Sequence, residues 1–221
     1  SVGRILKLSG KEPKHPRRQA KKHRLRERRT QAGMLWQIDA TPYEWLGKEH
    51  GKFALHAAVD DATGIVAGAF FTPNECMEGY SEVTKQGIKR YGVPLSIYSA
   101  RHTIFRSPNE KLTVDEELAG QKKSLSNFGE AMEELSIGHI KATTATTPQA
   151  KGRIERLWET FQDRIPEELR LLGIGCIEEA NGTLPELLNR HNERYRVNPA
   201  ESTEAYRVLE DIRAQGRKYS F

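Results

Sequence analysis

Asp39 and Glu155 are two carboxylates whose residue type could serve either metal chemistry or an ordinary structural role. Asp39 ends a strand predicted over residues 34–39, and Glu155 lies in a long helix predicted from Pro148 to about Leu172. At ~100° per residue, Glu155 projects about a quarter-turn from the centre of that helix's apolar stripe, so packing can hold it while it reaches a cleft. Hard divalent cations prefer carboxylate oxygen. The simpler alternatives are a turn-capping acid and a surface acid that pairs with nearby Lys and Arg.

Two further acids, Asp60 and Asp61, are adjacent and invite a metal interpretation as well. They follow a strand predicted over 52–59 and precede one predicted over 65–71. Residues 61–64 have the Asp-x-x-Gly pattern, which is ordinary hairpin chemistry because Asp bonds nearby backbone and Gly tolerates a positive φ. We therefore assign this pair to the turn.

A basic segment precedes the predicted strands. Residues 1–30 hold 12 Lys and Arg against Glu12 and Glu27, a net charge of +10, whereas the rest of the chain carries −5. Such a segment has too few apolar side chains to fold alone, and its natural partner is a polyanion that it binds in a salt-dependent manner. The feature favours a nucleic acid as partner; the alternatives are a solvated linker and a nuclear-localisation-like patch.

Composition excludes several classes of protein. The chain has 221 residues, of which 37% are hydrophobic, and a mean hydropathy of −0.69. No apolar run approaches the ~18 residues of a membrane span, which excludes a membrane function. The two cysteines, Cys76 and Cys176, belong to no Cys-x-x-Cys or Cys/His cluster, which excludes a zinc finger and a disulfide framework. We expect a protein of a reducing compartment.

The elements expected around these residues form an α/β chain. Beyond the first three strands they are a helix over 75–91, a strand over 95–99, a polar loop over 106–123, a helix near 126–136 capped by Ser126 or Ser124, a strand over 137–143, the helix over 148–172 with a kink or break at Pro166, and a helix over 177–193. This order predicts a mixed sheet covered by helices. A ribonuclease-H-like mixed sheet flanked by helices, with a basic N-terminal arm, fits well; that fold is known for acids at strand ends that bind two divalent metals.

Four ordered motifs connect these residues to a known family. They are WQIDAT at 36–41, AVDDATG at 58–64, YSARH at 98–102 and PQAKGRIER at 148–156, followed by HN at 191–192, PAES at 199–202 and Tyr206. Over roughly residues 34–209 the chain resembles the retroviral-type integrase core and, more narrowly, bacterial insertion-sequence transposases of the ISNCY type. The motifs are specific together, although each alone is weak.

The resemblance implies an Asp, Asp, Glu site for phosphoryl transfer with two Mg²⁺ or Mn²⁺ ions, about 3.5–4 Å apart. Matched motif by motif, Asp39 is the first carboxylate, which bridges both ions, and Glu155 is the third. At the second position the family has Tyr-Ser-Asp-Arg-His, whereas this chain has Ala100, whose methyl group cannot bind a metal. We do not expect His102 to replace it. We expect catalytic inactivity, through either a deliberate Asp→Ala replacement or natural decay of the element.

The activity implied for the active parent is hydrolysis at the 3′ end of the element, followed by attack of that 3′-hydroxyl on target DNA. The implied partners are double-stranded DNA, as transposon ends and target, and further copies of the chain, because two ends must be joined. The candidate DNA contacts are Arg17, Arg18, Lys21, Lys22, Arg24, Arg26, Arg28, Arg29, Arg101, His102, Arg106, Gln149, Lys151, Arg153 and Arg156. Gln149, or Tyr43 and Trp45, could approach bases, although such aromatics are more often core residues.

The resemblance also suggests how the chain is divided. Residues 1–10 are expected to be the remnant helix of a preceding helix-turn-helix-like DNA-binding domain, 11–33 a basic linker, 34–175 the catalytic core and 176–221 a C-terminal helical extension. Two rival functions are a naturally silent DNA-binding regulator and a ribonuclease-H-like nuclease that acts on RNA or junctions. We expect the protein in the bacterial cytoplasm, associated with the nucleoid.

Overall fold

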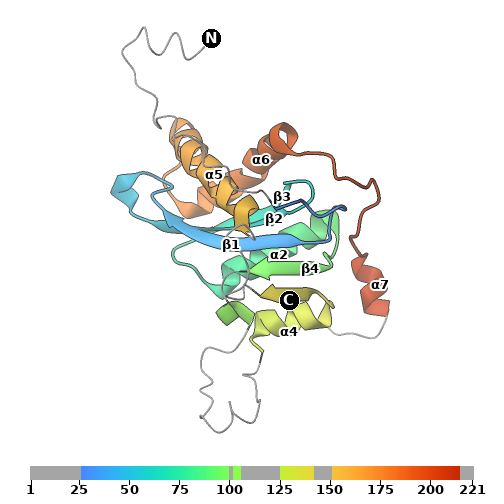
Figure 1. The fold of residues 1–221 in the computed structure, drawn as a ribbon. Coiled ribbons are helices and arrows are strands. Elements are labelled where there is room, and N and C mark those ends of the chain that lie inside the picture. Colours follow the sequence, from blue (N-terminus) through green and yellow to red (C-terminus); the bar gives the residue numbers. More distant parts are fainter. Residues whose placement is uncertain (1–25, 100–101, 106–124, 142–150, 215–221) are drawn as a thin grey trace.

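A five-stranded sheet forms the centre of the computed structural model, which describes residues 26–99, 102–105, 125–141 and 151–214 (Figure 1). The strands are β1 Trp36–Tyr43, β2 Phe53–Asp60, β3 Val66–Thr72, β4 Ser96–Ser99 and β5 Gly138–Lys141. Their order is β3-β2-β1-β4-β5; β1, β4 and β5 are parallel, and β2 is antiparallel to both of its neighbours. The mixed sheet that the sequence predicts is therefore confirmed.

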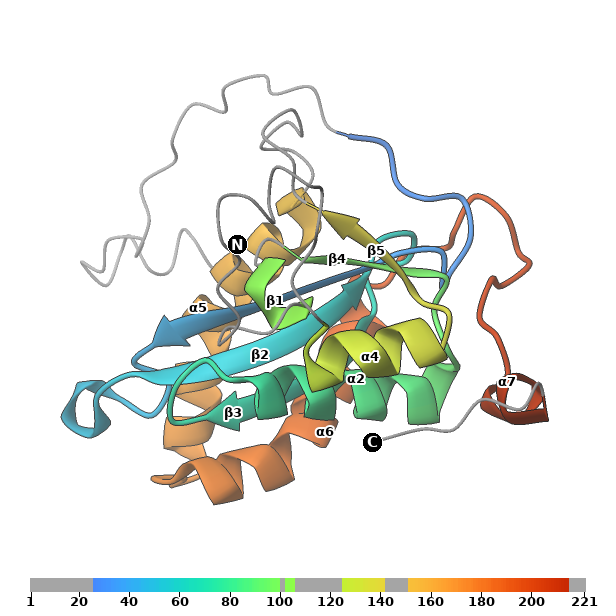
Figure 2. The same ribbon diagram turned by 90° about the horizontal axis from the view of Figure 1, so that it is seen from below.

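Helices cover both faces of this sheet. They are α2 Met77–Tyr91, α4 Asn127–Glu134, α5 Gly152–Leu171, α6 Ile177–Tyr195 and α7 Leu209–Ala214, with 3-10 turns η1 Lys48–His50 and η2 His102–Phe105. In Figure 1, α5 and α6 lie above the sheet and α2 and α4 below it, and Figure 2 shows the α2 and α4 side. The strand order and the helices on both faces give the ribonuclease-H-like architecture. In the part of the chain that the structure describes, no helix has the length and apolar character to cross a membrane.

The apolar stripe of α5 is buried as predicted. Its members are Ile154, Leu157, Trp158, Phe161, Ile165 and Leu169. They form one core cluster with the sheet, including Leu55 and Phe71, and with α6, including Leu184 and Leu188. Helix α5 continues through Pro166 and is not divided there. The C-terminal extension thus supplies α6 to this core.

A second core cluster lies between the other face of the sheet and helices α2 and α4. Trp36 and Ile38 of β1 belong to it, together with Tyr80 and Phe128. Helix α2 packs closely because it carries glycine at the contact: a Cβ on Gly87 would lie 2.4 Å from the Trp36 ring. Because side chains alternate along a strand, Gln37 and Asp39 lie on the opposite face of β1, the side of α5.

Strand β1 is longer than predicted. It pairs with β2 from Trp36, opposite Asp60, to Tyr43, opposite Phe53, so the prediction that Asp39 ends the strand is wrong. The parallel pairing with β4 runs only as far as Ile38. The antiparallel partner therefore extends β1 beyond the point that a local pattern indicates, and Asp39 lies just after the last pair that β1 forms with β4.

The segment after α6 holds the first described residues against the core. The backbone N–H groups of Val197, Glu201 and Ala205 donate to backbone carbonyls at residues 63, 30 and 32, at 2.9, 2.9 and 2.8 Å. The HN motif at 191–192 adds a side-chain contact to the sheet. Asn192 accepts from Val66 N at 2.8 Å and donates to Val66 O at 3.0 Å, so it acts as an additional edge partner of β3.

Candidate active site

Asp39 is a partly buried carboxylate with one ion-pair partner among the residues that the structure describes. Its side chain is 17% exposed, and the Lys151 ammonium lies 3.3 Å from its Oδ2. Lys151 is the residue directly before α5. The contact therefore joins the middle of β1 to the start of the helix that carries Glu155.

A second contact fixes the same helix end. The Ile154 backbone N–H donates to Gln37 Oε1 at 3.1 Å, and the Gln37 side chain is completely buried. Since Gln37 and Asp39 share one face of β1, the first turn of α5 is attached to that face at two points. Glu155 is exposed and follows Lys151 by four residues, which makes the two side chains neighbours on a helix surface. The two contacts thus hold the first turn of α5, which carries Glu155, against the face of β1 that carries Asp39.

The second position of the signature, Ala100, follows β4. Ser99, the last residue of β4, pairs with Ile38, the residue before Asp39. Ala100 itself and Arg101 lie outside the described residues. The strand that leads to Ala100 therefore runs parallel to β1 and ends beside it, at the level of Asp39.

The donor set suits a hard cation only in part. Asp39 and Glu155 supply carboxylate oxygen, which Mg²⁺ and Mn²⁺ prefer, but the methyl group of Ala100 supplies no ligand. Among the residues that the structure describes, no group of three or more His, Cys, Asp or Glu is placed to hold a metal. The three-carboxylate set that the resemblance implies for a pair of ions is therefore one carboxylate short.

Asp60 makes the hydrogen bonds of a hairpin turn, as predicted. Its Oδ1 accepts from the backbone N–H and the hydroxyl of Thr63, both at 2.8 Å, and its Oδ2 accepts from Gly33 N at 2.8 Å. Burial raises the pKa of Asp60, and these hydrogen bonds together oppose that rise. Asp60 thus closes the β2–β3 hairpin and also holds the segment before β1.

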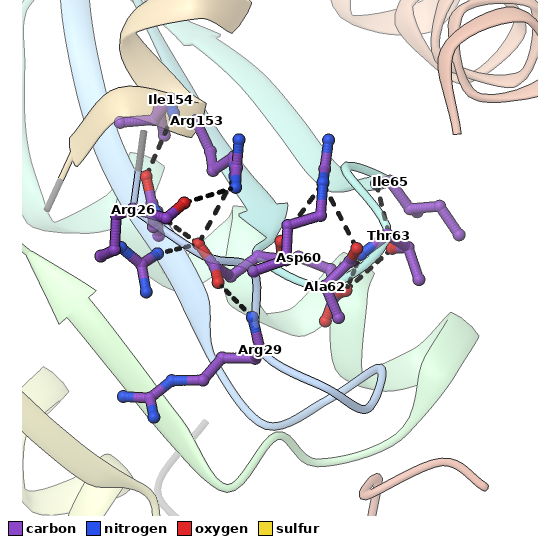
Figure 3. A network of polar contacts seen from close by, with 11 residues as sticks. Arg26, Arg29, Asp60, Ala62, Thr63, Ile65, Arg153 and Ile154 are labelled. Carbon is purple, nitrogen blue, oxygen red and sulfur yellow. Dashed lines mark hydrogen bonds and ion pairs between the residues drawn. The ribbon is translucent and has the colours of Figure 1, made fainter. Parts of the chain in front are cut away.

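Asp61 does more than the turn interpretation predicts, because it is the centre of a buried polar network (Figure 3). Its carboxylate is completely buried and bonds to the Arg26 guanidinium. It also accepts from the Arg29 backbone N–H at 2.9 Å and from Gln37 Nε2 at 2.8 Å, and it faces Arg153 Nε at 3.9 Å. The network continues from Arg153 to the Arg26 carbonyl at 3.1 Å. We call these five residues the Asp61 network.

The network engages several predicted DNA contacts within the protein. Besides Arg26 and Arg153, Arg28 donates to the carbonyls of residues 61 and 62 at 3.2 and 3.3 Å. Burial lowers the pKa of Arg153, and the neighbouring positive charge of Arg28 lowers it further. Arg29 and Arg156 are exposed, and in Figure 3 the Arg29 side chain extends away from the network.

The remaining predicted contacts fall in other parts of the chain. Outside the described residues lie Arg17, Arg18, Lys21, Lys22, Arg24, Arg101, Arg106 and Gln149, together with helix 1–10 and loop 106–123. His102 begins η2. Trp45 is completely buried in the core cluster under α5, so the core interpretation of this aromatic is confirmed, and Tyr43 packs against it edge-on at 5.2 Å.

The chain is similar in sequence to two proteins that are both named as transposases. No family model matches the chain. It is 37% identical over 177 residues to the transposase for insertion sequence IS1202 of Streptococcus pneumoniae, covering 79% of this chain and 36% of the relative. It is 34% identical over 187 residues to the putative transposase y4bF of Sinorhizobium fredii, covering 85% of this chain and 39% of the relative.

A solved structure of similar fold is the HTLV-2 integrase catalytic core domain in complex with magnesium, with a TM-score of 0.47 and 20% identity, covering 69% of this chain and 83% of that one. The sheet order and the two transposase relatives define a core of the DDE transposase/integrase class. Within that class the chain is a relative of insertion-sequence transposases, and it spans less than two-fifths of the length of the two relatives compared.

Proposed function

We propose that this chain is the catalytic core of a DNA transposase whose active parent cleaves DNA at the 3′ end of its element and transfers that end to target DNA. The observation that carries the proposal is the double attachment of α5 to β1, by Lys151 to Asp39 and by Ile154 to Gln37. It brings together the two segments that carry the matched carboxylates, beside the end of β4. Relatives that are transposases support the same function.

Asp39 and Glu155 are the residues that would hold divalent metal. Two Mg²⁺ or Mn²⁺ ions, when bound, supply charge neutralisation for the attacking and leaving oxygens of an in-line displacement. Asp39 is held in place by its pairing with Ala57 of β2, just after the last pair of β1 with β4, and Glu155 by the burial of its neighbour Ile154. With Ala100 at the second position, we propose that this chain binds DNA without cleaving it.

DNA in this proposal is held by its backbone. The exposed Arg156 in the first turns of α5 and the exposed Arg29 supply positive charge, and the sequence before residue 26 is rich in Lys and Arg. Such contacts position DNA without reading its sequence. Binding should weaken steeply with salt, because each neutralised phosphate releases counterions. We further propose that copies of the chain assemble on DNA ends in the bacterial cytoplasm, at the nucleoid.

The test is restoration of the missing carboxylate. Ala100→Asp should give Mg²⁺-dependent cleavage of a duplex that carries the matching element end, with an increase on the order of 10³-fold or more over the unchanged chain. Ala100→Asn is the matched control, since it has the same shape without the charge, and it should stay near the background. Adding Asp39→Asn to Ala100→Asp should abolish the gain.

A silent DNA-binding regulator is the second candidate, and Ala100 is the observation that favours it. If folded Ala100→Asp protein binds the correct end but does not cut it, the regulator replaces the proposed enzyme. If the restored protein cleaves but never joins a 3′ end to a second duplex, a ribonuclease-H-like nuclease is the better description. Gel analysis of a labelled end, with and without target DNA, distinguishes these outcomes.

A further inference from the structure

Lys151 holds the position that a bound cation would need at Asp39. Its ammonium approaches a single carboxylate oxygen, Oδ2, at 3.3 Å, and the two side chains are 24% and 17% exposed. The hydrogen bonds of the buried Asp61 carboxylate to Gln37 and to the Arg29 backbone are shorter, at 2.8 and 2.9 Å. An ion pair that is longer, single and open to solvent is held weakly, so the Lys151 ammonium can leave Asp39 at small cost.

Among the described residues, Arg153 is another cation at the start of α5, and it is engaged elsewhere. The Arg153 guanidinium, two residues further along, faces Asp61 and donates to the Arg26 carbonyl. Lys151 is therefore the ion-pair partner that the structure gives Asp39. Lysine suits an exchangeable role because its ammonium is a compact charge on a flexible four-carbon stem.

At Gly152, the start of α5 is not covered by any residue that the structure describes. A Cβ on Gly152, the residue next to Lys151, would meet nothing within 4 Å. The backbone of a large ligand can therefore approach Lys151 closely at this point. The exposed Arg156 lies on the next turn of the same helix, about 140° around its axis from Lys151, so only a polyanion large enough to reach around the helix start would meet both charges.

From these contacts we infer that Lys151 couples DNA binding to divalent-cation binding at Asp39. Without DNA, the Lys151 ammonium neutralises Asp39 and opposes a second cation there. When a DNA phosphate takes the ammonium, the carboxylate is released for the divalent ion. Because linkage is reciprocal, the divalent ion should strengthen DNA binding by the same factor. This inference rests on the proposed function, since it requires Asp39 to be a metal ligand, and it adds a regulation of that site.

The experiment is a Mn²⁺ titration, followed by electron paramagnetic resonance of the free ion, on the chain as it stands and on Ala100→Asp, each with and without a short DNA duplex. We expect the duplex to tighten Mn²⁺ binding by about 5- to 150-fold, the usual range of coupling between sites. Lys151→Gln should tighten Mn²⁺ binding in the absence of DNA and should remove the effect of the duplex. Lys151→Met provides a second neutral variant, and circular dichroism checks that each variant folds.

Arg170→Gln is the matched control, because it removes one positive charge from the far end of α5, where Arg170 pairs with Glu167. It should leave Mn²⁺ affinity unchanged. If both Lys151 variants bind Mn²⁺ with the same affinity as the chain with Lys151, or more weakly, the inference is overturned while the proposed function stands. If Asp39→Asn leaves Mn²⁺ binding intact, or if Ala100→Asp binds no Mn²⁺, the proposed function itself fails, and the inference fails with it.

Discussion

Asp39 and Asp61 lie on the same side of one sheet, yet their surroundings differ. Asp61 follows β2, is completely buried and meets side chains or backbone from the first described segment, from β1 and from α5. Asp39 lies in β1, is partly exposed and pairs with one lysine. A buried charge persists only where it is paired and hydrogen-bonded, so Asp61 is suited to hold structure, whereas Asp39 keeps carboxylate oxygen available for chemistry.

The two regions are joined through Gln37. Its Nε2 donates to Asp61 at 2.8 Å, and its Oε1 accepts from the Ile154 backbone at 3.1 Å. The buried region thereby fixes the first turn of α5, which carries Glu155 and follows directly after Lys151, the ion-pair partner of Asp39. The contacts of Asp61 therefore hold the start of α5 in place, and this is what the proposed exchange of cations at Asp39 requires.

The largest effect should come from Asp61→Ala. It leaves the Arg26 and Arg153 charges without their carboxylate and the Gln37 amide without its acceptor. Breaking a buried pair by removing one partner costs about 3–5 kcal/mol, and we expect a loss in that range in the free energy of unfolding, measured by urea denaturation.

Asp61→Asn serves as the control for this variant, because it keeps one acceptor oxygen without the charge. It should lose less than Asp61→Ala. A loss below about 1 kcal/mol for Asp61→Ala, as for an exposed ion pair, would remove the contrast between the two acids.

Low pH should reduce the free energy of unfolding, because His56 is buried in its neutral form. This residue is completely buried, stacks edge-on against Tyr80 and accepts from the Cys76 backbone N–H through Nε2. Burial lowers its pKa from 6.5 to about 4. Between pH 6.5 and pH 4 the unfolded chain binds the proton more readily than the folded chain does. The contribution of neutral His56 to the free energy of unfolding is therefore complete above pH 6.5 and is lost as the pH falls toward 4, by about 3 kcal/mol.

Urea denaturation at a series of pH values measures this loss. His56→Gln should flatten the curve without abolishing it, since burial also lowers the pKa of His191 to about 4. The raised pKa of Asp60 acts in the opposite sense, because its stabilising contribution is lost as the pH rises. An unchanged slope in His56→Gln would contradict a neutral, buried imidazole.

Local patterns in the sequence were sufficient for much of the fold. The stripe from Ile154 to Ile165 predicts the buried face of α5, and Ser126 caps α4 as expected, accepting from Gly129 N at 3.1 Å. Such signals depend on neighbours within one or two turns. They did not give the length of β1, because its extension to Tyr43 depends on pairing with β2.

The motifs single out Asp39 and Glu155 as site residues, and that assignment stays a prediction. The polar network around Asp61 could not be predicted from the sequence. The contacts of Asp61 join residues that are 24 to 92 positions away in the sequence, and no local periodicity encodes such pairs. One signal was present in the sequence. Of the two adjacent acids, Asp60 makes the side-chain contacts of the hairpin turn, so Asp61 needed another explanation.

Gln37→Leu should have an intermediate effect. The leucine fills a similar volume but leaves the Ile154 N–H and one Asp61 lone pair without their partner, and an unsatisfied buried group costs about 1–3 kcal/mol. We expect a loss of about 2 kcal/mol in urea denaturation. In the Ala100→Asp background the variant should also lower cleavage at limiting Mn²⁺, because the first turn of α5 is less firmly held. Thr41→Val, on the same face of β1 but further along, is the control.

The smallest effect on stability should come from Asp39→Asn. The amide keeps the shape of the carboxylate and loses only a part-exposed ion pair with Lys151, and such pairs contribute about 0–1 kcal/mol. We expect the free energy of unfolding to change by less than about 1 kcal/mol, while the Mn²⁺ affinity of the Ala100→Asp protein collapses. A stability loss as large as that of Asp61→Ala would make Asp39 another structural acid. Stability that is nearly unchanged, together with lost metal binding, is the signature of a carboxylate that the fold positions without depending on it.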